Sequence, residues 1–366
     1  MQIEREPMKR ILSSLSLVVF LSCGPAAQPV VCTADAYPDE GYATNAAAEL
    51  ELRARLEDLV GKMEEAATAR PTAAQMEALY VTGTPSLSDL STVAARAGVR
   101  EAFAQTELAG ATPWTPAEPP VGNGGLYGTH VYNERGVDLP ETVEKLLFGG
   151  MQYAETGRLM TDRATVADID RMVALFGASP GFPMDDKAAV NPDVLVAKYA
   201  KKRTNAAAAT PGPYLAIKQA FINARAAVKG GAACSSQRTE AFAQIRDQWE
   251  RTLLGTAIFY LNTAGTTLAK ATPTDAERAG ALHQIGEALG FMRGLKALPA
   301  EHRIITDAQL DQVLATLGGT TLPGAEAYKF ITATNANIDK LGLAVTQIQA
   351  ARQFTSEEIA TFKASF

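Results

Sequence analysis

His283 and Glu287 lie four residues apart in HQIGEALGF, residues 283–291. The pattern is typical of a helix, and side chains four residues apart share one helical face. Imidazole and carboxylate are both ligands for iron or zinc, so the pair could form half of a metal site. The other ligands would have to come from other helices, and Glu250, beside Trp249, is one candidate. The same pair could instead form a buried hydrogen bond that fixes helix packing.

Few features of the sequence support a hydrolytic activity. The chain has three histidines, and neither an HExxH nor an HxxEH motif surrounds them. No serine lies in a pattern typical of a strand-to-helix nucleophile turn. We expect His130, in YGTHVYNERG, to be an exposed loop residue. The sequence therefore contains no complete protease or hydrolase motif and favours a protein that is not an enzyme.

The first residues are typical of an export signal. Residues 8–10 (MKR) are basic, and residues 11–22 form an apolar and hydroxyl-rich run. The run ends in FLSCG, which resembles a bacterial lipobox with Cys23 as the lipidated residue. We predict a signal peptide over residues 1–22 and a cell-envelope protein, periplasmic or at the surface, attached to the membrane through Cys23. Ordinary cleavage after a nearby small residue, such as Ala26, is the alternative.

A tether is expected to follow the signal, over residues 23–44, because this segment contains several prolines and no helical period. It holds Cys32, and Cys234 lies in a Gly/Ser-rich connection. In an oxidising compartment these two cysteines could pair. Their distance cannot be obtained from the sequence, so pairing stays open.

Composition restricts the partners. Charged residues make up 20% of the chain, and the formal net charge of -6 includes the basic leader. This acidity argues against a nucleic-acid partner. Hydrophobic residues make up 47%, enough for a sizeable core, and the many alanines suit closely packed helices.

Helix start and stop signals recur along the rest of the chain. Capping patterns predict helix starts at Thr72, Ser86, Thr165, Thr306 and Thr355. No alternating strand pattern of useful length is present. We predict an all-α fold of antiparallel helical bundles. The helical domain is expected over residues 45–366, with subdomains at about 45–205 and 210–366 as one way to divide it. Longer helices are expected at about 140–160, 213–229, 238–262, 275–297 and 335–352, a shorter one at 324–333, and a long loop at 109–129.

The segment HQIGEALGFMRGLKAL resembles the HxxSExxGFxxxL signature of a branch of the imelysin-like bacterial lipoproteins, the domain of unknown function DUF4856. The stretches LELRARLEDLVGKMEEA, VEKLLFGGMQYAE and VALFGASPGFP resemble other parts of that branch, so the resemblance runs from about residue 45 to the end. Two departures stand out. Gly286 replaces the serine of the signature, and Asp170 alone survives from a Trp-Asp-Glu run of the branch.

This resemblance implies a helical-bundle protein of the periplasm or cell surface, in a family with members in iron uptake. It also implies that the His/Glu motif is a metal or ligand site, with Asp170 as a further candidate ligand. We therefore expect an exported, lipid-anchored protein that binds a metal ion or a metal-bearing ligand. The alternative is a structural or interaction lipoprotein in which His283 and Glu287 form a buried pair.

Overall fold

The computed structural model describes residues 30–185, 192–208, 210–319, 324–332 and 337–366. The predicted signal peptide and the lipidation site Cys23 lie outside these residues. Residues 31–366 form one compact unit, which is described below. Within the described residues, no helix combines the length and apolar character needed to cross a membrane.

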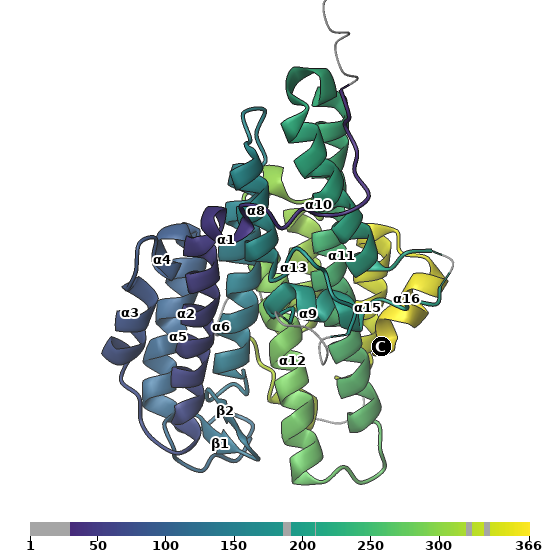
Figure 1. Ribbon diagram of the computed structural model, residues 1–366. Coiled ribbons are helices and arrows are strands. Elements are labelled where there is room, and N and C mark those ends of the chain that lie inside the picture. Colours follow the sequence, from purple (N-terminus) through teal and green to yellow (C-terminus); the bar gives the residue numbers. More distant parts are fainter. Residues whose placement is uncertain (1–29, 186–191, 209, 320–323, 333–336) are drawn as a thin grey trace, which may run out of the picture. The chain divides into compact units, whose positions relative to one another are not determined.

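The unit is built of helices, as predicted, with one small hairpin (Figure 1). The first half contains α1 (Tyr42–Asn45), α2 (Ala47–Glu64), η1 (Glu65–Ala67), α3 (Ala73–Val81), α4 (Leu87–Leu90), α5 (Val93–Ala109), β1 (Gly125–Tyr127), β2 (His130–Tyr132), α6 (Leu139–Leu147), η2 (Phe148–Tyr153), α7 (Ala154–Leu159), α8 (Val166–Phe176) and α9 (Leu195–Lys202). The second half contains α10 (Pro213–Lys229), η3 (Gly231–Cys234), α11 (Ser235–Leu268), α12 (Asp275–Lys296), η4 (Ala300–His302), α13 (Asp307–Thr316), α14 (Lys329–Thr332), α15 (Ile338–Arg352) and α16 (Ser356–Lys363).

The helix starts follow local capping chemistry. At each of the five predicted starts, the hydroxyl of the capping residue accepts a hydrogen bond from the backbone N–H three residues later. The side chain of that later residue accepts one from the capping residue's own N–H. These reciprocal bonds satisfy N–H groups that the helix itself leaves unpaired. All five starts are confirmed.

The long helix α11 organises the core. It packs against α10, α12, α15 and α16, and α12 packs in turn against α6 and η2. Trp249 lies at the centre of α11 and is fully buried. Its ring stacks on Tyr153 at 5.2 Å and meets Phe176 edge-on at 4.9 Å. Through these contacts one hydrophobic core joins elements from both halves of the chain.

Several regions differ from the predictions. A hairpin of β1 and β2 lies where only loop was expected, with antiparallel pairing of Leu126 with Val131. Helix α11 is longer than the 238–262 predicted, since Ser235 already belongs to it and it ends at Leu268. Near the C-terminus, α14 begins only at Lys329, so residues 324–328 of the helix predicted over 324–333 are not helical. Short segments with weak periodicity are the places where sequence patterns are least informative.

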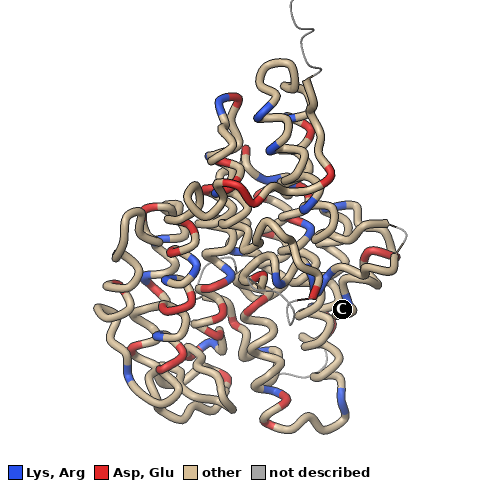
Figure 2. The backbone as a smooth tube through the Cα atoms, in the orientation of Figure 1, with Lys and Arg blue, Asp and Glu red and all other residues tan. Residues whose placement is uncertain are grey.

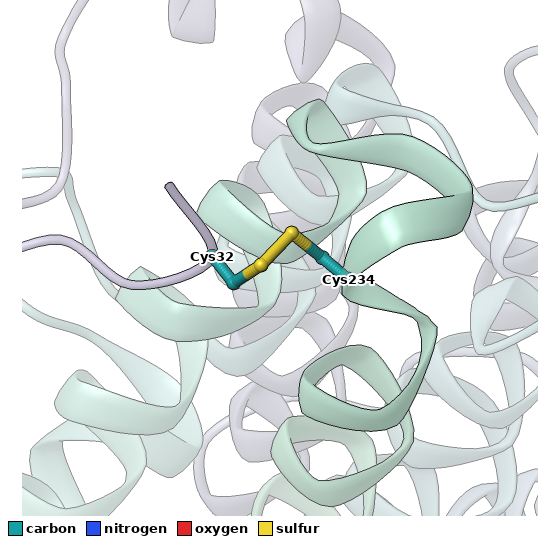
Figure 3. Close-up of a disulfide and its surroundings, with 2 residues drawn as sticks. All are labelled: Cys32 and Cys234. Carbon is teal, nitrogen blue, oxygen red and sulfur yellow. A yellow bond between two sulfur atoms is a disulfide. The ribbon is translucent and has the colours of Figure 1, made fainter. Parts of the chain in front are cut away.

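The tether prediction is wrong for residues 31–44, which pack against the helices. Tyr37 and Tyr42 are buried there. Cys32 forms a disulfide with Cys234, at the corner between α10 and α11 (Figure 3). We call residues 31–41 the strap, because this segment is held at Cys32 and again at Tyr37. Aromatic anchors and a covalent bond hold it in place although it contains no helix or strand.

A candidate metal centre between helices α6 and α12

The candidate site is a row of polar side chains between α6 and α12. Helix α12 contributes His283 and Glu287. Asp138 caps the start of α6 by accepting the backbone N–H of Glu141, and Pro140 occupies the first turn. The cap and first turn of α6 therefore place the acidic side chains of Asp138 and Glu141 at the interface with α12.

Glycines allow the two helices to approach closely. Gly286, Gly290 and Gly294 follow at intervals of four along α12. A Cβ at Gly286 would lie 2.8 Å from the Cβ of Asp138. At Gly290 it would lie 2.7 Å from the Cβ of Lys145. Larger residues would force α6 away, so the glycine in place of the signature serine is a packing requirement in this chain.

His283 bridges the two helices. Its Nδ1 lies 3.0 Å from Oδ2 of Asp138, and its Nε2 lies 3.2 Å from Oε1 of Glu287. Asp138 and Glu287 are almost completely buried. The predicted pairing of His283 with Glu287 across one helical turn is thus present, and Asp138 is a second partner that the sequence did not suggest.

His130 also belongs to this site. Its ring stacks on that of His283, with 4.1 Å between centroids and 27° between planes. Its Nδ1 lies 3.6 Å from Oδ2 of Asp138, and its side chain is 30% exposed. The expectation of an exposed loop histidine is therefore wrong. The Gly128-Thr129 connection, with glycine at a φ of 63°, is the sequence signal that could have indicated the hairpin that carries His130.

A buried lysine completes the row. The side chain of Lys145 is 1% exposed, and its Nζ contacts the carboxylates of Glu141 and Glu144 on α6. It also lies 3.4 Å from Oε2 of Glu287. The hydroxyl of Tyr199 donates to the same Glu287 oxygen at 3.4 Å. The buried Glu287 carboxylate is thus stabilised from both sides.

The pKa values follow from these contacts. Burial disfavours the charged form of His283, but hydrogen bonds to Asp138 and Glu287 outweigh it and raise its pKa to about 10. Burial opposes ionisation of Glu287 too, yet Lys145 and His283 hold its pKa below the usual value. Burial lowers the pKa of His130, against the attraction of Asp138. Burial raises the pKa of Glu141 to about 7, although Lys145 counteracts it.

The row can be reached from solvent. A cavity of about 260 Å³ is lined by His130, Asp138, Glu141 and Glu64, among others. Three acidic side chains thus share the lining of this cavity with His130. An ion entering the cavity would meet imidazole and carboxylate groups directly.

Two overlapping sets of side chains have the composition of a metal site. Potential ligand atoms of His130, Asp138 and His283 lie within 4.8 Å of one another, and so do those of Glu141, His283 and Glu287. Two imidazoles with carboxylates suit zinc or iron. Within these sets His283 contacts Asp138 through one ring nitrogen and Glu287 through the other, so a bound ion would replace a proton of His283.

Asp170 and Glu250 do not join this site. Asp170 accepts hydrogen bonds from Tyr37 at 2.5 Å, Asn45 at 2.7 Å and Arg225 at 3.0 Å. It therefore holds the strap to the helical core.

Glu250 accepts the backbone N–H groups of Ile304 and Ile305, and its Oε2 lies 3.3 Å from Nε of Arg352. Within the part of the chain that the structure describes, neither Glu250 nor Asp170 appears in a potential metal group with His283. The resemblance suggests Asp170 and the position beside Trp249 suggests Glu250, but only tertiary packing reveals that the oxygens of both already have partners.

Comparisons of the chain with protein-family models, with curated proteins and with solved structures found no match. The resemblance to imelysin-like lipoproteins stays a prediction.

Proposed function

We propose that this chain is an exported, lipid-anchored protein of the bacterial cell envelope that binds a metal ion, iron or zinc, or a metal-bearing ligand. The proposed ligands are His130, Asp138 and His283, which form one of the two sets, while Glu287 holds the opposite ring nitrogen of His283. One observation carries the proposal: two histidines and buried carboxylates from β2, α6 and α12 converge beside a cavity. A role in iron acquisition is the part that rests on the family resemblance.

The charges of the site support a cation. Asp138 and Glu287 are buried, and Glu141 and Glu144 lie alongside them. Lys145 and His283 balance only part of this negative charge. A divalent ion would replace the proton of His283 and bind both imidazoles as neutral ligands. Metal affinity is therefore expected to rise with pH.

Metal content measured by mass spectrometry tests the proposal. Chain lacking residues 1–23 is exposed to iron or zinc, desalted and analysed beside His283→Ala and His130→Gln, with circular dichroism on each. The third histidine supplies a matched control in His302→Gln, because His302 lies on η4, outside both potential metal groups. We expect about one equivalent in wild type and in the control, and a loss in both site variants with the fold retained. Wild type without metal, or site variants that keep it, would contradict the proposal.

The second candidate function is a structural or interaction lipoprotein. The observation that favours it is that both ring nitrogens of His283 already have carboxylate partners. This candidate predicts no bound metal and a marked loss of stability in His283→Ala, since a buried carboxylate would lose its partner. The same set of samples therefore distinguishes the two.

The membrane attachment has its own test. If Cys23 carries the lipid, Cys23→Ala in a bacterial host moves the protein from the membrane fraction to the soluble fraction. Mass spectrometry of the mature N-terminus would identify the acyl groups. A mature chain that begins downstream of Cys23 would contradict the proposed anchor.

A further inference from the structure

A second cavity lies away from the α6–α12 site, between the connection from α9 to α10, the middle of α11 and the last helix, α16. Its volume is about 440 Å³. The residues that matter for its chemistry are Arg203, Pro213, Gln248, Arg251, Thr361 and Phe362. No residue of the candidate metal centre lines it.

Arg203 brings a buried charge to this cavity. The residue is 1% exposed. Its Nη1 donates to the carbonyl of Phe362 at 2.9 Å, its Nη2 donates to Oγ of Ser365 at 3.3 Å, and its guanidinium lies over the ring of Phe259 at 4.1 Å. All these partners are neutral. The buried Nε has no hydrogen-bond partner.

The guanidinium is also without a carboxylate. Among the described residues, no acidic group lies within ion-pair distance of Arg203. A buried charge without a counter-ion is costly, and arginine does not escape the cost by losing its proton at neutral pH. Burial lowers the pKa of Arg203 to about 10, which still leaves it charged. A bound anion would remove this imbalance.

The other charges around the cavity limit the anion. Arg251 is neutralised by Asp247, at 2.7 Å, and by Glu358. Glu357 is exposed at the cavity rim, where it repels multiply charged anions. Of the two cations that line the cavity, Arg203 is therefore the one without a carboxylate partner, and its single charge matches a single negative charge. Proline and phenylalanine side chains supply apolar wall for an organic body.

We propose that this cavity binds a small organic monoanion, a carboxylate on an apolar body, with the carboxylate placed near Arg203 and the apolar part against Phe362. Carboxylate and guanidinium form charge-assisted hydrogen bonds, which are the stronger class of such bonds. The cavity is large enough for a ligand of several carbon atoms, since ligand pockets begin at roughly 300 Å³. This site is independent of the proposed metal centre.

Calorimetric titration of the purified protein at pH 7 tests the proposal with three probes. Octanoate has the proposed charge and body, octanol has only the body, and inorganic phosphate has only charge. We expect saturable binding of octanoate at one site, at least about tenfold tighter than binding of octanol, because octanol cannot form the charge-assisted contact with Arg203. Phosphate should neither bind nor compete. Absence of octanoate binding, or equal binding of octanol, would overturn the proposal, as would a site that prefers phosphate.

Variants locate the site. Arg203→Met should weaken octanoate binding at least tenfold, and Arg203→Lys should restore part of it. Lys363→Gln is the matched control, because it removes a positive charge from the exposed end of α16 without touching the cavity. Unchanged binding in Arg203→Met would refute the assignment. If that variant fails to fold, the comparison of octanoate with octanol on wild type still decides the question.

Discussion

At the scale of residues, the candidate site is governed by the protonation of His283. His283 lies between Asp138 and Glu287 and donates to both as an imidazolium. The stacked His130 is held towards its neutral form by burial. His283 thus favours its charged form and His130 its neutral form, because only His283 closely contacts two carboxylates.

This arrangement makes the stability of the metal-free protein depend on pH. The pKa of His283 is about 10 in the folded chain, against an ordinary value of 6.5. Its contribution is therefore complete below pH 6.5 and is lost as the pH rises towards 10, since the folded state then binds more protons than the unfolded state. We expect chemical denaturation in the presence of a chelator to show wild type losing stability across this range.

The His283→Gln variant is the comparison for that measurement. It should be less stable than wild type by about 1–3 kcal/mol near pH 6, with the difference shrinking as the pH approaches 10. A difference that stays constant over this range would mean that His283 is not held as an imidazolium.

The sequence indicated part of this site, and the limit has a physical reason. The pairing of His283 with Glu287 follows from helical geometry, which depends only on spacing. His130 and Asp138 come from other elements, more than 140 residues away from His283 in sequence. Their proximity depends on tertiary packing, and no local pattern encodes it.

At the scale of elements, the glycines of α12 set the distance to α6. Gly290→Ala should destabilise the protein by about 1–3 kcal/mol, because its Cβ would lie 2.7 Å from Lys145 Cβ and 3.0 Å from the carbonyl oxygen of Thr142. Thermal and chemical denaturation measure the effect. On the same helix, Gly280→Ala is the control, since a Cβ there meets nothing within 4 Å. It should be neutral or stabilising by up to about 1 kcal/mol.

Equal effects of the two alanines would show that helix propensity, not contact with α6, determines the outcome. Helix starts were predictable because a capping box such as that of Thr306 and Gln309 involves only neighbouring residues. The packing role of Gly286 was not predictable, because its close neighbour Asp138 belongs to another helix.

At the scale of the whole molecule, positively and negatively charged residues are interspersed along the helices (Figure 2). The compact unit of residues 31–366 is held by its core and by one covalent bond between residues 202 positions apart. Reduction, or the Cys32→Ser and Cys234→Ser double variant, should lower the free energy of unfolding by about 2–5 kcal/mol. Denaturation with and without reductant measures it.

The double variant is its own control in that experiment. Its stability should not respond to reductant, whereas that of wild type should fall to the same level. Wild type that ignores reductant under denaturing conditions would contradict a disulfide between Cys32 and Cys234.

The same bond determines where the chain bears tension. A pull on the N-terminal end reaches the body at Cys32, where the disulfide passes it directly to the α10–α11 corner. The strap beyond Cys32, with Tyr37 on Asp170, is a second and non-covalent attachment. In a chain lipidated at Cys23, the segment from Cys23 to Cys32 would connect the lipid to the compact unit. Fully stretched this segment would be roughly 30 Å long, so lipidation at Cys23 would limit how far the α10–α11 corner can lie from the membrane surface.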